Sequence, residues 1–84
     1  EPIHKQRPLW LISEPQSLTL KKNKPWLDGV LEFLTGRERI ESGWWDEKPV
    51  CRDYYVVKTL TGRRAWVFRQ VEDTKRWYLH GWFG

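Results

Sequence analysis

Apolar side chains recur along the second half of the chain in runs whose spacing is typical of β-strands. The segments 52–60 and 63–71 are rich in β-branched and aromatic residues, and the polar pair Thr61–Gly62 separates them. A second polar break, residues 72–75, precedes a final aromatic run. Runs of this length between short turn signals predict a three-stranded antiparallel meander over residues 52–80.

Both faces of this meander are expected to be apolar. Because successive side chains of a strand point to opposite faces, Trp66 and Phe68 should share one face of their strand, with Ala65, Val67 and Arg69 on the other. In the preceding strand, Tyr54 and Val56 should lie opposite Tyr55 and Val57. A small sheet cannot bury both faces unless it curls or another element covers it. The leading strands, within residues 9–20, are expected to cover one face. Failing that, the second face is a docking surface.

The first half of the chain carries shorter signals. Leu9–Ile12 is a strand candidate that the polar sequence SEP ends, and Ser17–Leu20 is a second candidate. KKNKPW follows as a polar turn, in which Lys24 is extended because it precedes a proline. Val30–Thr35 lies between two glycines, which favours a strand over one helical turn.

A fourth strand is expected in RERIESGWW, with Gly43 as a bulge or bend where it enters the meander. The fold class that these patterns predict is mainly β, with little helix. The architecture is a small antiparallel meander curled into a sheet or a partly open barrel.

The length of 84 residues predicts one domain, and the balance of 39% hydrophobic and 31% charged residues is that of a soluble globular protein. Residues 1–8 are interpreted as a linker or arm, and residues 9–84 as a single C-terminal β domain cut from a longer protein. No apolar run approaches the length of a membrane-spanning helix. Cys51 is the only cysteine, which excludes an internal disulfide and suits a cytoplasmic location.

The formal charge of +4 raises the question of nucleic-acid binding. Residues 1–24 hold five basic and two acidic residues, a net of +3, whereas residues 25–84 hold ten and nine, a net of +1. Basic residues also interleave with Trp66, Trp77 and Tyr78, as in single-strand binding surfaces. Arginines next to aspartates are more often cross-strand pairs. The candidate nucleic-acid contacts are Lys21, Lys22, Lys24, Arg63 and Arg64, and direct DNA binding is expected to be weak or absent.

Catalysis finds little support in the sequence. There is no glycine-rich phosphate loop and no nucleophile motif, and Glu41 and Asp46 are best interpreted as solvated charges. His4, His80 and Cys51 lack the spacing of metal ligands, so neither a metal nor a cofactor is expected. His80 is interpreted as a hydrogen-bonded structural residue before a turn glycine. The chain is therefore expected not to be an enzyme.

Trp44 and Trp45 are adjacent, so in an extended segment they face opposite sides. One is expected in the core and the other on a surface that binds a partner, with charged residues as a polar rim. The candidate partner-binding residues are Trp44, Trp45, Asp46, Arg52, Tyr54, Tyr55, Arg76, Trp82 and Phe83. The stretch QSLTL resembles the short peptides that bacterial proteins insert into the sliding clamp, but Thr19 and Leu20 depart from that pattern, which favours an ordinary strand.

The order of several unusual stretches is similar to the extreme C-terminal region of ImuB-type proteins. These stretches are RPLWLISEPQSL, KPWLDG, RERIESGWWDE, RDYYVV, GRRAWVFRQ and RWYLHGWFG. The resemblance runs from about Arg7 to Gly84. ImuB-type proteins are Y-family DNA-polymerase-like subunits of bacterial SOS mutagenesis cassettes.

The resemblance implies a non-catalytic hub of translesion synthesis. It implies as partners a RecA-like protein of the ImuA type, an error-prone replicative-type DNA polymerase and, through the parent protein, the sliding clamp. The implied role of this region is a protein-interaction module in damage-induced mutagenesis. The alternative is a nucleic-acid-binding β domain that assists the polymerase on its template.

Overall fold

The structure is a computed structural model that describes residues 8–41 and 51–83. Every regular element in these residues is a β-strand. The strands are β1 (Trp10–Ser17), β2 (Thr19–Lys21), β3 (Lys24–Trp26), β4 (Glu32–Phe33), β5 (Glu38–Glu41), β6 (Cys51–Lys58), β7 (Arg64–Gln70) and β8 (Asp73–Trp82). The described part of the chain thus contains no helix of the kind that crosses a lipid bilayer.

Strands β6, β7 and β8 form the predicted meander, in which each strand pairs with the next in antiparallel register. The turn between β6 and β7 contains Gly62 at φ +89°, a conformation that favours glycine. The second connection is shorter than predicted, because β8 already begins at Asp73. The prediction of three antiparallel strands over residues 52–80 is therefore confirmed, and the second polar break is narrower than expected.

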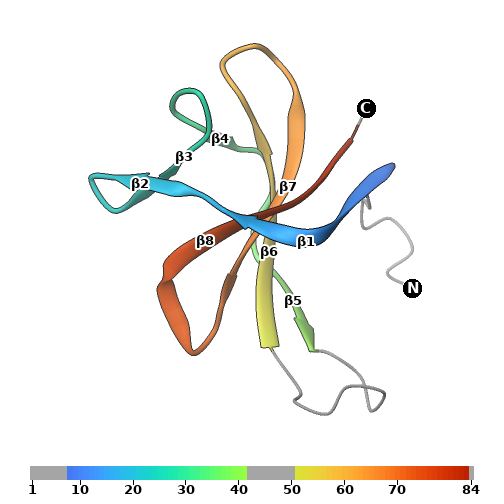
Figure 1. The fold of residues 1–84 in the computed structure, drawn as a ribbon, viewed down its shortest axis with the longest axis vertical. Coiled ribbons are helices and arrows are strands. Elements are labelled where there is room, and N and C mark those ends of the chain that lie inside the picture. Colours follow the sequence, from blue (N-terminus) through green and yellow to red (C-terminus); the bar gives the residue numbers. More distant parts are fainter. Residues whose placement is uncertain (1–7, 42–50, 84) are drawn as a thin grey trace.

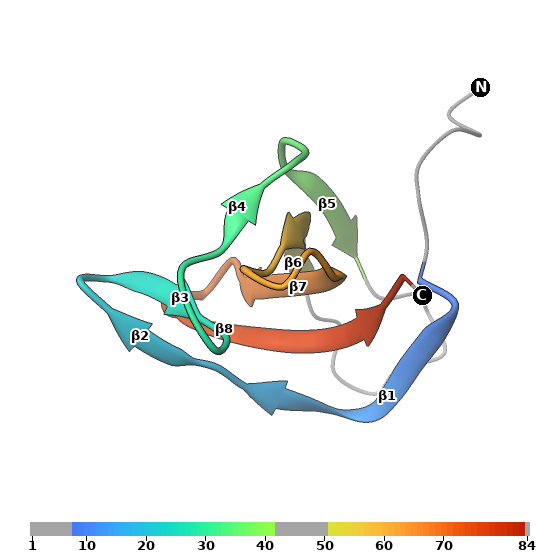
Figure 2. The same cartoon turned by 90° about the horizontal axis from the view of Figure 1, so that it is seen from above.

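The larger sheet has the order β1-β8-β7-β6-β4, and β5 also pairs with β6. Strands β4 and β5 share one edge of β6, since Phe33 of β4 lies opposite Val57 and Glu41 of β5 lies opposite Cys51. The first and last strands of the chain are neighbours at the other side of the meander (Figure 1). Figure 2 shows the resulting curl, with β1 and β8 below and β4 and β5 above. The curled, mainly β fold is confirmed, and the described strands form an open sheet.

The small second sheet is the hairpin of β2 and β3. Lys22 and Asn23 both have positive φ, at 53° and 64°, as a two-residue type I′ turn requires. The polar turn was thus predicted correctly, and so was the extended Lys24 that begins β3. The apolar stretch from Val30 to Thr35 gives only the two-residue strand β4.

The sequence interpretation of the first strand was wrong at its end. Strand β1 does not stop at SEP but continues to Ser17. Its pairing with β8 shifts between Leu11 and Gln16, so the irregular stretch accommodates Pro15. A proline is tolerated there because β1 is an edge strand.

The two faces of the meander are buried in separate clusters, as the alternation predicted. One cluster consists of Leu18, Leu31, Val57, Ala65, Val67, Trp77 and Leu79. The other consists of Tyr54, Val56, Trp66 and Phe68. Leu18 and the partly buried Ile12 come from the leading segment, which confirms that this segment covers one face. The predicted fourth strand is confirmed as β5, whereas Gly43 lies outside the described residues.

Candidate interaction groove

A hollow of about 340 Å³ opens between the β2–β3 hairpin and the face of the meander that carries Tyr55, Arg69 and Trp77. These three side chains share a face because Arg69 is paired with Trp77, and Tyr55 lies two residues along β6 from Asp53, the partner of Arg69. The remaining lining residues come from the hairpin and the segment after it: Asn23, Lys24, Pro25, Val30, Leu31 and Phe33.

Three aromatic rings form the floor and one wall of this hollow. The Phe33 ring meets Tyr55 edge-on at 5.2 Å and Trp77 at 5.6 Å between ring centroids. Tyr55 and Trp77 lie 5.4 Å apart at a tilt of 49°. Trp77 is 7% exposed and Phe33 is 42% exposed, so the floor is buried and the wall is accessible. Edge-to-face contacts of this kind fix the rings relative to one another.

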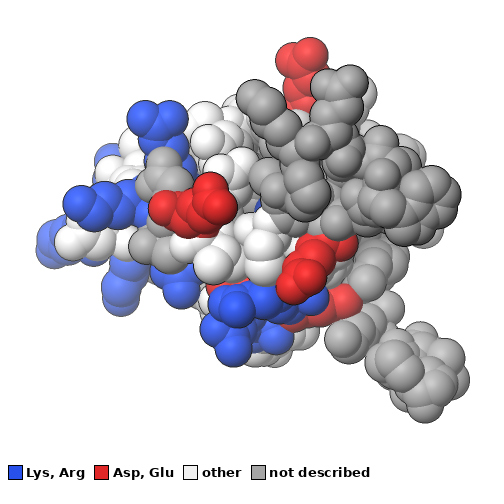
Figure 3. Space-filling view, turned by 90° about the horizontal axis from the view of Figure 1, so that it is seen from below, with Lys and Arg blue, Asp and Glu red and all other residues white. Residues whose placement is uncertain are grey.

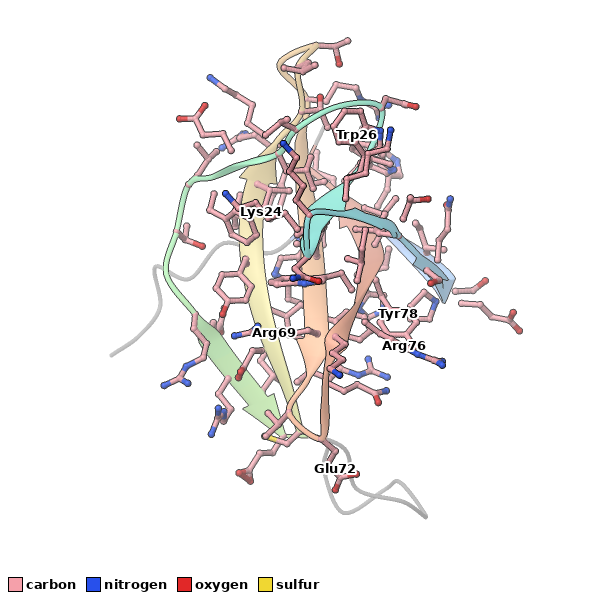
Figure 4. The ribbon with its side chains drawn as sticks, turned by 90° about the vertical axis from the view of Figure 1, so that its left-hand side faces the viewer. Lys24, Trp26, Arg69, Glu72, Arg76 and Tyr78 are labelled. Carbon is pink, nitrogen blue, oxygen red and sulfur yellow. The ribbon has the colours of Figure 1, made fainter. Side chains whose placement is uncertain are left out.

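Two cations lie among these apolar side chains. The Arg69 guanidinium lies 5.2 Å from the centroid of the Trp77 ring, and its buried Nε has no hydrogen-bond partner among the described residues. Lys24 is exposed at the hairpin end. Figure 4 shows Lys24 above Arg69 on this side of the molecule, with Glu72 farther away at the β7–β8 turn.

A buried carboxylate lies near Arg69 but is already paired. Asp53 is 3% exposed and accepts two hydrogen bonds from Arg39, at 2.8 Å from Nε and 3.3 Å from Nη2. The hydrogen bond from Arg39, with smaller contributions from the charges of other arginines including Arg69, lowers the pKa of Asp53 below its usual value. Asp53 thus lies opposite both Arg39 and Arg69 in the sheet, and the hydrogen bonds that it accepts come from Arg39.

A second hollow of about 330 Å³ adjoins the first along the hairpin. Its lining residues are Lys21, Lys22, Lys24, Pro25, Trp26 and Val30. Lys24, Pro25 and Val30 line both hollows, so the two are neighbours, and we call them together the basic–aromatic groove. The linings of the two hollows contain four cations and no aspartate or glutamate. In Figure 3 the basic side chains gather at the end of the molecule that carries the hairpin.

The chain aligns with curated ImuB proteins from two strains of Caulobacter vibrioides, NA1000 / CB15N and ATCC 19089 / CIP 103742 / CB 15. The identity to each is 44% over 61 residues, and the alignment covers 58% of this chain. Over this segment the chain is similar to ImuB. The aligned part spans 13% of the length of each relative. No family model matches the chain, and no solved structure matches it. The C-terminal position of the segment within its parent protein stays a prediction.

The predicted partner-binding residues of the ImuB-like chain do not form one surface. Trp44, Trp45 and Asp46 lie outside the described residues. Tyr55 is half-buried in the groove, and Arg76 is exposed on β8. The remaining predicted residues, Arg52, Tyr54, Trp82 and Phe83, lie elsewhere.

Tyr54 is a core residue, which corrects its assignment to an outer patch. Its ring is 3% exposed and stacks on Trp66 with centroids 3.9 Å apart. The hydroxyl is 2.8 Å from Nδ1 of His80 and accepts a hydrogen bond of 3.2 Å from Nη1 of Arg52. The Arg52 guanidinium also lies 4.4 Å from the centroid of the Phe68 ring. Arg52 and Tyr54 therefore belong to a polar network inside the second cluster.

His80 is hydrogen-bonded and structural, as predicted, but the following glycine lies within β8 and not in a turn. The pairs Trp66–Gly81 and Val67–Leu79 leave His80 as an extra residue on β8, a bulge that places its ring parallel to Trp66. Burial, and to a smaller extent the charge of Arg52, lowers the pKa of His80. No three His, Cys, Asp or Glu residues in the described part of the chain converge as metal ligands would.

The candidate nucleic-acid contacts occupy two separate places. Lys21, Lys22 and Lys24 are exposed on the hairpin, where Nζ of Lys21 lies 4.1 Å from the centroid of the Trp26 ring. Arg63 and Arg64 are exposed at the start of β7. There the Arg63 guanidinium lies 3.9 Å from the Trp82 ring, and the Arg64 guanidinium lies 5.7 Å from the Phe83 ring.

Trp26, Phe33 and Trp77 were not among the predicted partner-binding residues, although they line the groove. Strand alternation together with the meander register places Trp77 beside Arg69, so the sequence held a usable signal for Trp77. For Phe33 there was no comparable signal, because a two-residue strand has no readable period.

Proposed function

We propose that this domain is a non-catalytic protein-interaction module of a translesion-synthesis complex in damage-induced mutagenesis. Its likeness to ImuB connects the chain with that process. The observation that carries the proposal is the basic–aromatic groove, an accessible depression with an ordered aromatic floor and a cationic rim. Deep aromatic pockets with a polar rim are where binding energy concentrates in protein interfaces.

The proposed partners are those that the ImuB resemblance implies. They are the ImuA-type RecA-like protein and the error-prone replicative-type DNA polymerase, while the sliding clamp is contacted through the parent protein. A segment of the ImuA-type protein or of the polymerase docks in the groove, with Phe33 as the accessible wall and Tyr55 and Trp77 as the floor. The role of the domain in this scheme is to hold subunits together and not to perform chemistry.

The test is direct binding between the purified 84-residue chain and each purified partner, measured by calorimetry. We expect Phe33→Ala to weaken binding by about 2 kcal/mol, because it removes an aromatic side chain at the centre of the groove. The control is Leu60→Ala, which removes a side chain that is 72% exposed and lies outside both groove linings. Failure of the unmodified chain to bind either partner would contradict the proposal.

A second candidate function is binding of single-stranded nucleic acid in support of the polymerase. It is favoured by the exposed hairpin lysines and by the two arginines stacked over Trp82 and Phe83. Aromatic side chains together with cations are the elements of such surfaces. These two places do not share an element, and the body of the chain has nearly balanced charge, so we rank this function second.

A further inference from the structure

We infer that the basic–aromatic groove binds an extended acidic peptide, in which carboxylates flank one large apolar anchor residue. This inference rests on the proposed function, because it names the chemistry of the partner segment that the module receives. Three properties of the groove support this inference: its charge, its size and the contacts that its aromatic rings already make.

The charge of the groove selects an anion. Lys24 and Arg69 line the inner hollow, Lys21 and Lys22 line the outer one, and neither lining contains an acidic residue. The buried Nε of Arg69 has no hydrogen-bond partner among the described residues. The Nε is enclosed, so a ligand carboxylate would meet the remaining N–H groups of the planar guanidinium, a geometry that arginine uses to bind carboxylates. Asp53 lies opposite Arg69 in the sheet, but the hydrogen bonds that it accepts come from Arg39.

The size of the groove selects a short apolar anchor on an extended chain. The inner hollow of about 340 Å³ lies at the low end of the range of roughly 300–1,000 Å³ that is usual for ligand pockets. That volume suits one large side chain and not the apolar face of a helix. Lys24 lines both hollows and Lys21 and Lys22 line the outer one, so these lysines lie next to the residues that would flank the anchor.

The state of the rings argues against a nucleobase in the same place. Trp77 is almost fully buried, and the edge-to-face contacts of Phe33 with Tyr55 and Trp77 cover part of the faces of these rings. Lys21 lies over the face of Trp26. Stacking of bases requires open aromatic faces, which these contacts reduce. An aliphatic or aromatic anchor that packs against the exposed side of Phe33 needs no such face.

The experiment uses a fluorescent synthetic peptide with the sequence Asp-Asp-Phe-Leu-Asp-Asp, titrated with the 84-residue chain and followed by anisotropy. We expect binding with a Kd below ~1 mM. Replacing every Asp of the probe by Asn, or its Phe and Leu by Ala, should weaken binding about tenfold. A short oligo-dT strand should not compete at equal concentration.

Variants of the chain test whether the probe binds in the groove. Lys24→Gln should weaken binding about threefold, since an exposed charge pair contributes little, and Arg69→Gln should weaken it about tenfold. The matched control is Lys58→Gln, which removes one positive charge outside both linings. Circular dichroism of each variant checks that the strands persist.

The inference is overturned if the acidic probe fails to bind, if the Asn probe binds equally well, or if oligo-dT displaces the peptide. An equal effect of Lys58→Gln and Lys24→Gln would also overturn it. The proposed function is judged separately, by whether the ImuA-type protein or the polymerase binds. If a partner binds and Arg69→Gln has no effect on that binding, the proposed function as an interaction module is retained and the acidic-peptide inference fails.

Discussion

At the scale of single residues, the hydroxyl of Tyr54 joins the His80 ring to the Arg52 guanidinium. It is bonded to Nδ1 of His80 and accepts from Arg52, whose buried Nε has no hydrogen-bond partner among the described residues. A buried polar group that loses its partner costs more than the hydrogen bond contributed. The network therefore favours one arrangement of the side chains in the second cluster, which its apolar contacts alone would not fix.

Tyr54→Phe removes only that hydroxyl and should destabilise the fold. We expect the free energy of unfolding to fall by about 1–3 kcal/mol, because His80 and Arg52 are left partly unsatisfied in the interior. Urea unfolding followed by tryptophan fluorescence measures the change. Tyr55→Phe, which removes the same atom on the opposite face, is the matched control. Equal losses in both variants would show that the network contributes nothing of its own.

His80 makes stability depend on pH. Because burial lowers its pKa in the folded state, the unfolded chain takes up a proton that the folded chain does not. Stability should therefore decrease as the pH falls below the ordinary histidine value of about 6.5. Unfolding free energies at about pH 7 and about pH 5 measure this decrease, and His80→Gln should reduce it.

The loss that is linked to Asp53 occurs at lower pH, because its lowered pKa confers stability that disappears only as that carboxylate protonates. A decrease that survives in His80→Gln would contradict the assignment to His80.

At the scale of elements, the sequence predicted the strands of the meander well and those of the first half of the chain less well. Strands β6 and β7 have seven or more residues, so their alternation is readable and assigned both faces correctly. The three-residue strands of the hairpin and the two residues of β4 give no period. Their positions follow from the turn at Lys22 and Asn23 and from packing over the meander, which depends on residues distant in sequence.

Gly81 permits the close pairing of β1 with β8. A Cβ atom built on it would lie 2.6 Å from the backbone oxygen of Trp10, whereas a Cβ on Gly36 would meet nothing within 4 Å. Gly81→Ala should therefore destabilise the fold by about 1–3 kcal/mol, because one strand backbone must move. Gly36→Ala is the matched control and should be neutral. Thermal melting compares the two variants, and a Gly81→Ala variant as stable as the control would contradict the close approach.

At the scale of the whole molecule, the candidate site assembles residues from five strands or connections. Lys24, Phe33, Tyr55, Arg69 and Trp77 lie far apart in the sequence and meet only because the sheet curls beneath the hairpin. The types of these residues and the alternation within each strand were readable from the sequence, but the register that brings Tyr55 and Arg69 to one face was not. The sequence also did not indicate that the hairpin packs over that face, because this packing joins residues that are far apart in the chain.

The distribution of charge over the molecule predicts weak binding to DNA. Residues 25–84 carry a net charge of only +1, and the hairpin lysines are few. Few phosphate contacts imply a shallow dependence of affinity on salt concentration. Titration of single-stranded DNA at several salt concentrations measures this dependence, and we expect a Kd weaker than about 1 μM at physiological salt. A tighter Kd would favour the nucleic-acid function over the interaction module.

The pairing of β1 with β8 joins two strands that the ribosome makes at different times, one early and one late. Trp10 is partnered by Trp82, so the first strand emerges from the ribosome well before its neighbour exists. Contacts between such distant residues form slowly, because the chain between them must be ordered first. Until the last strand is made, Trp10 and Leu11 lack the residues with which they pair, and even in the folded chain their side chains stay mostly exposed.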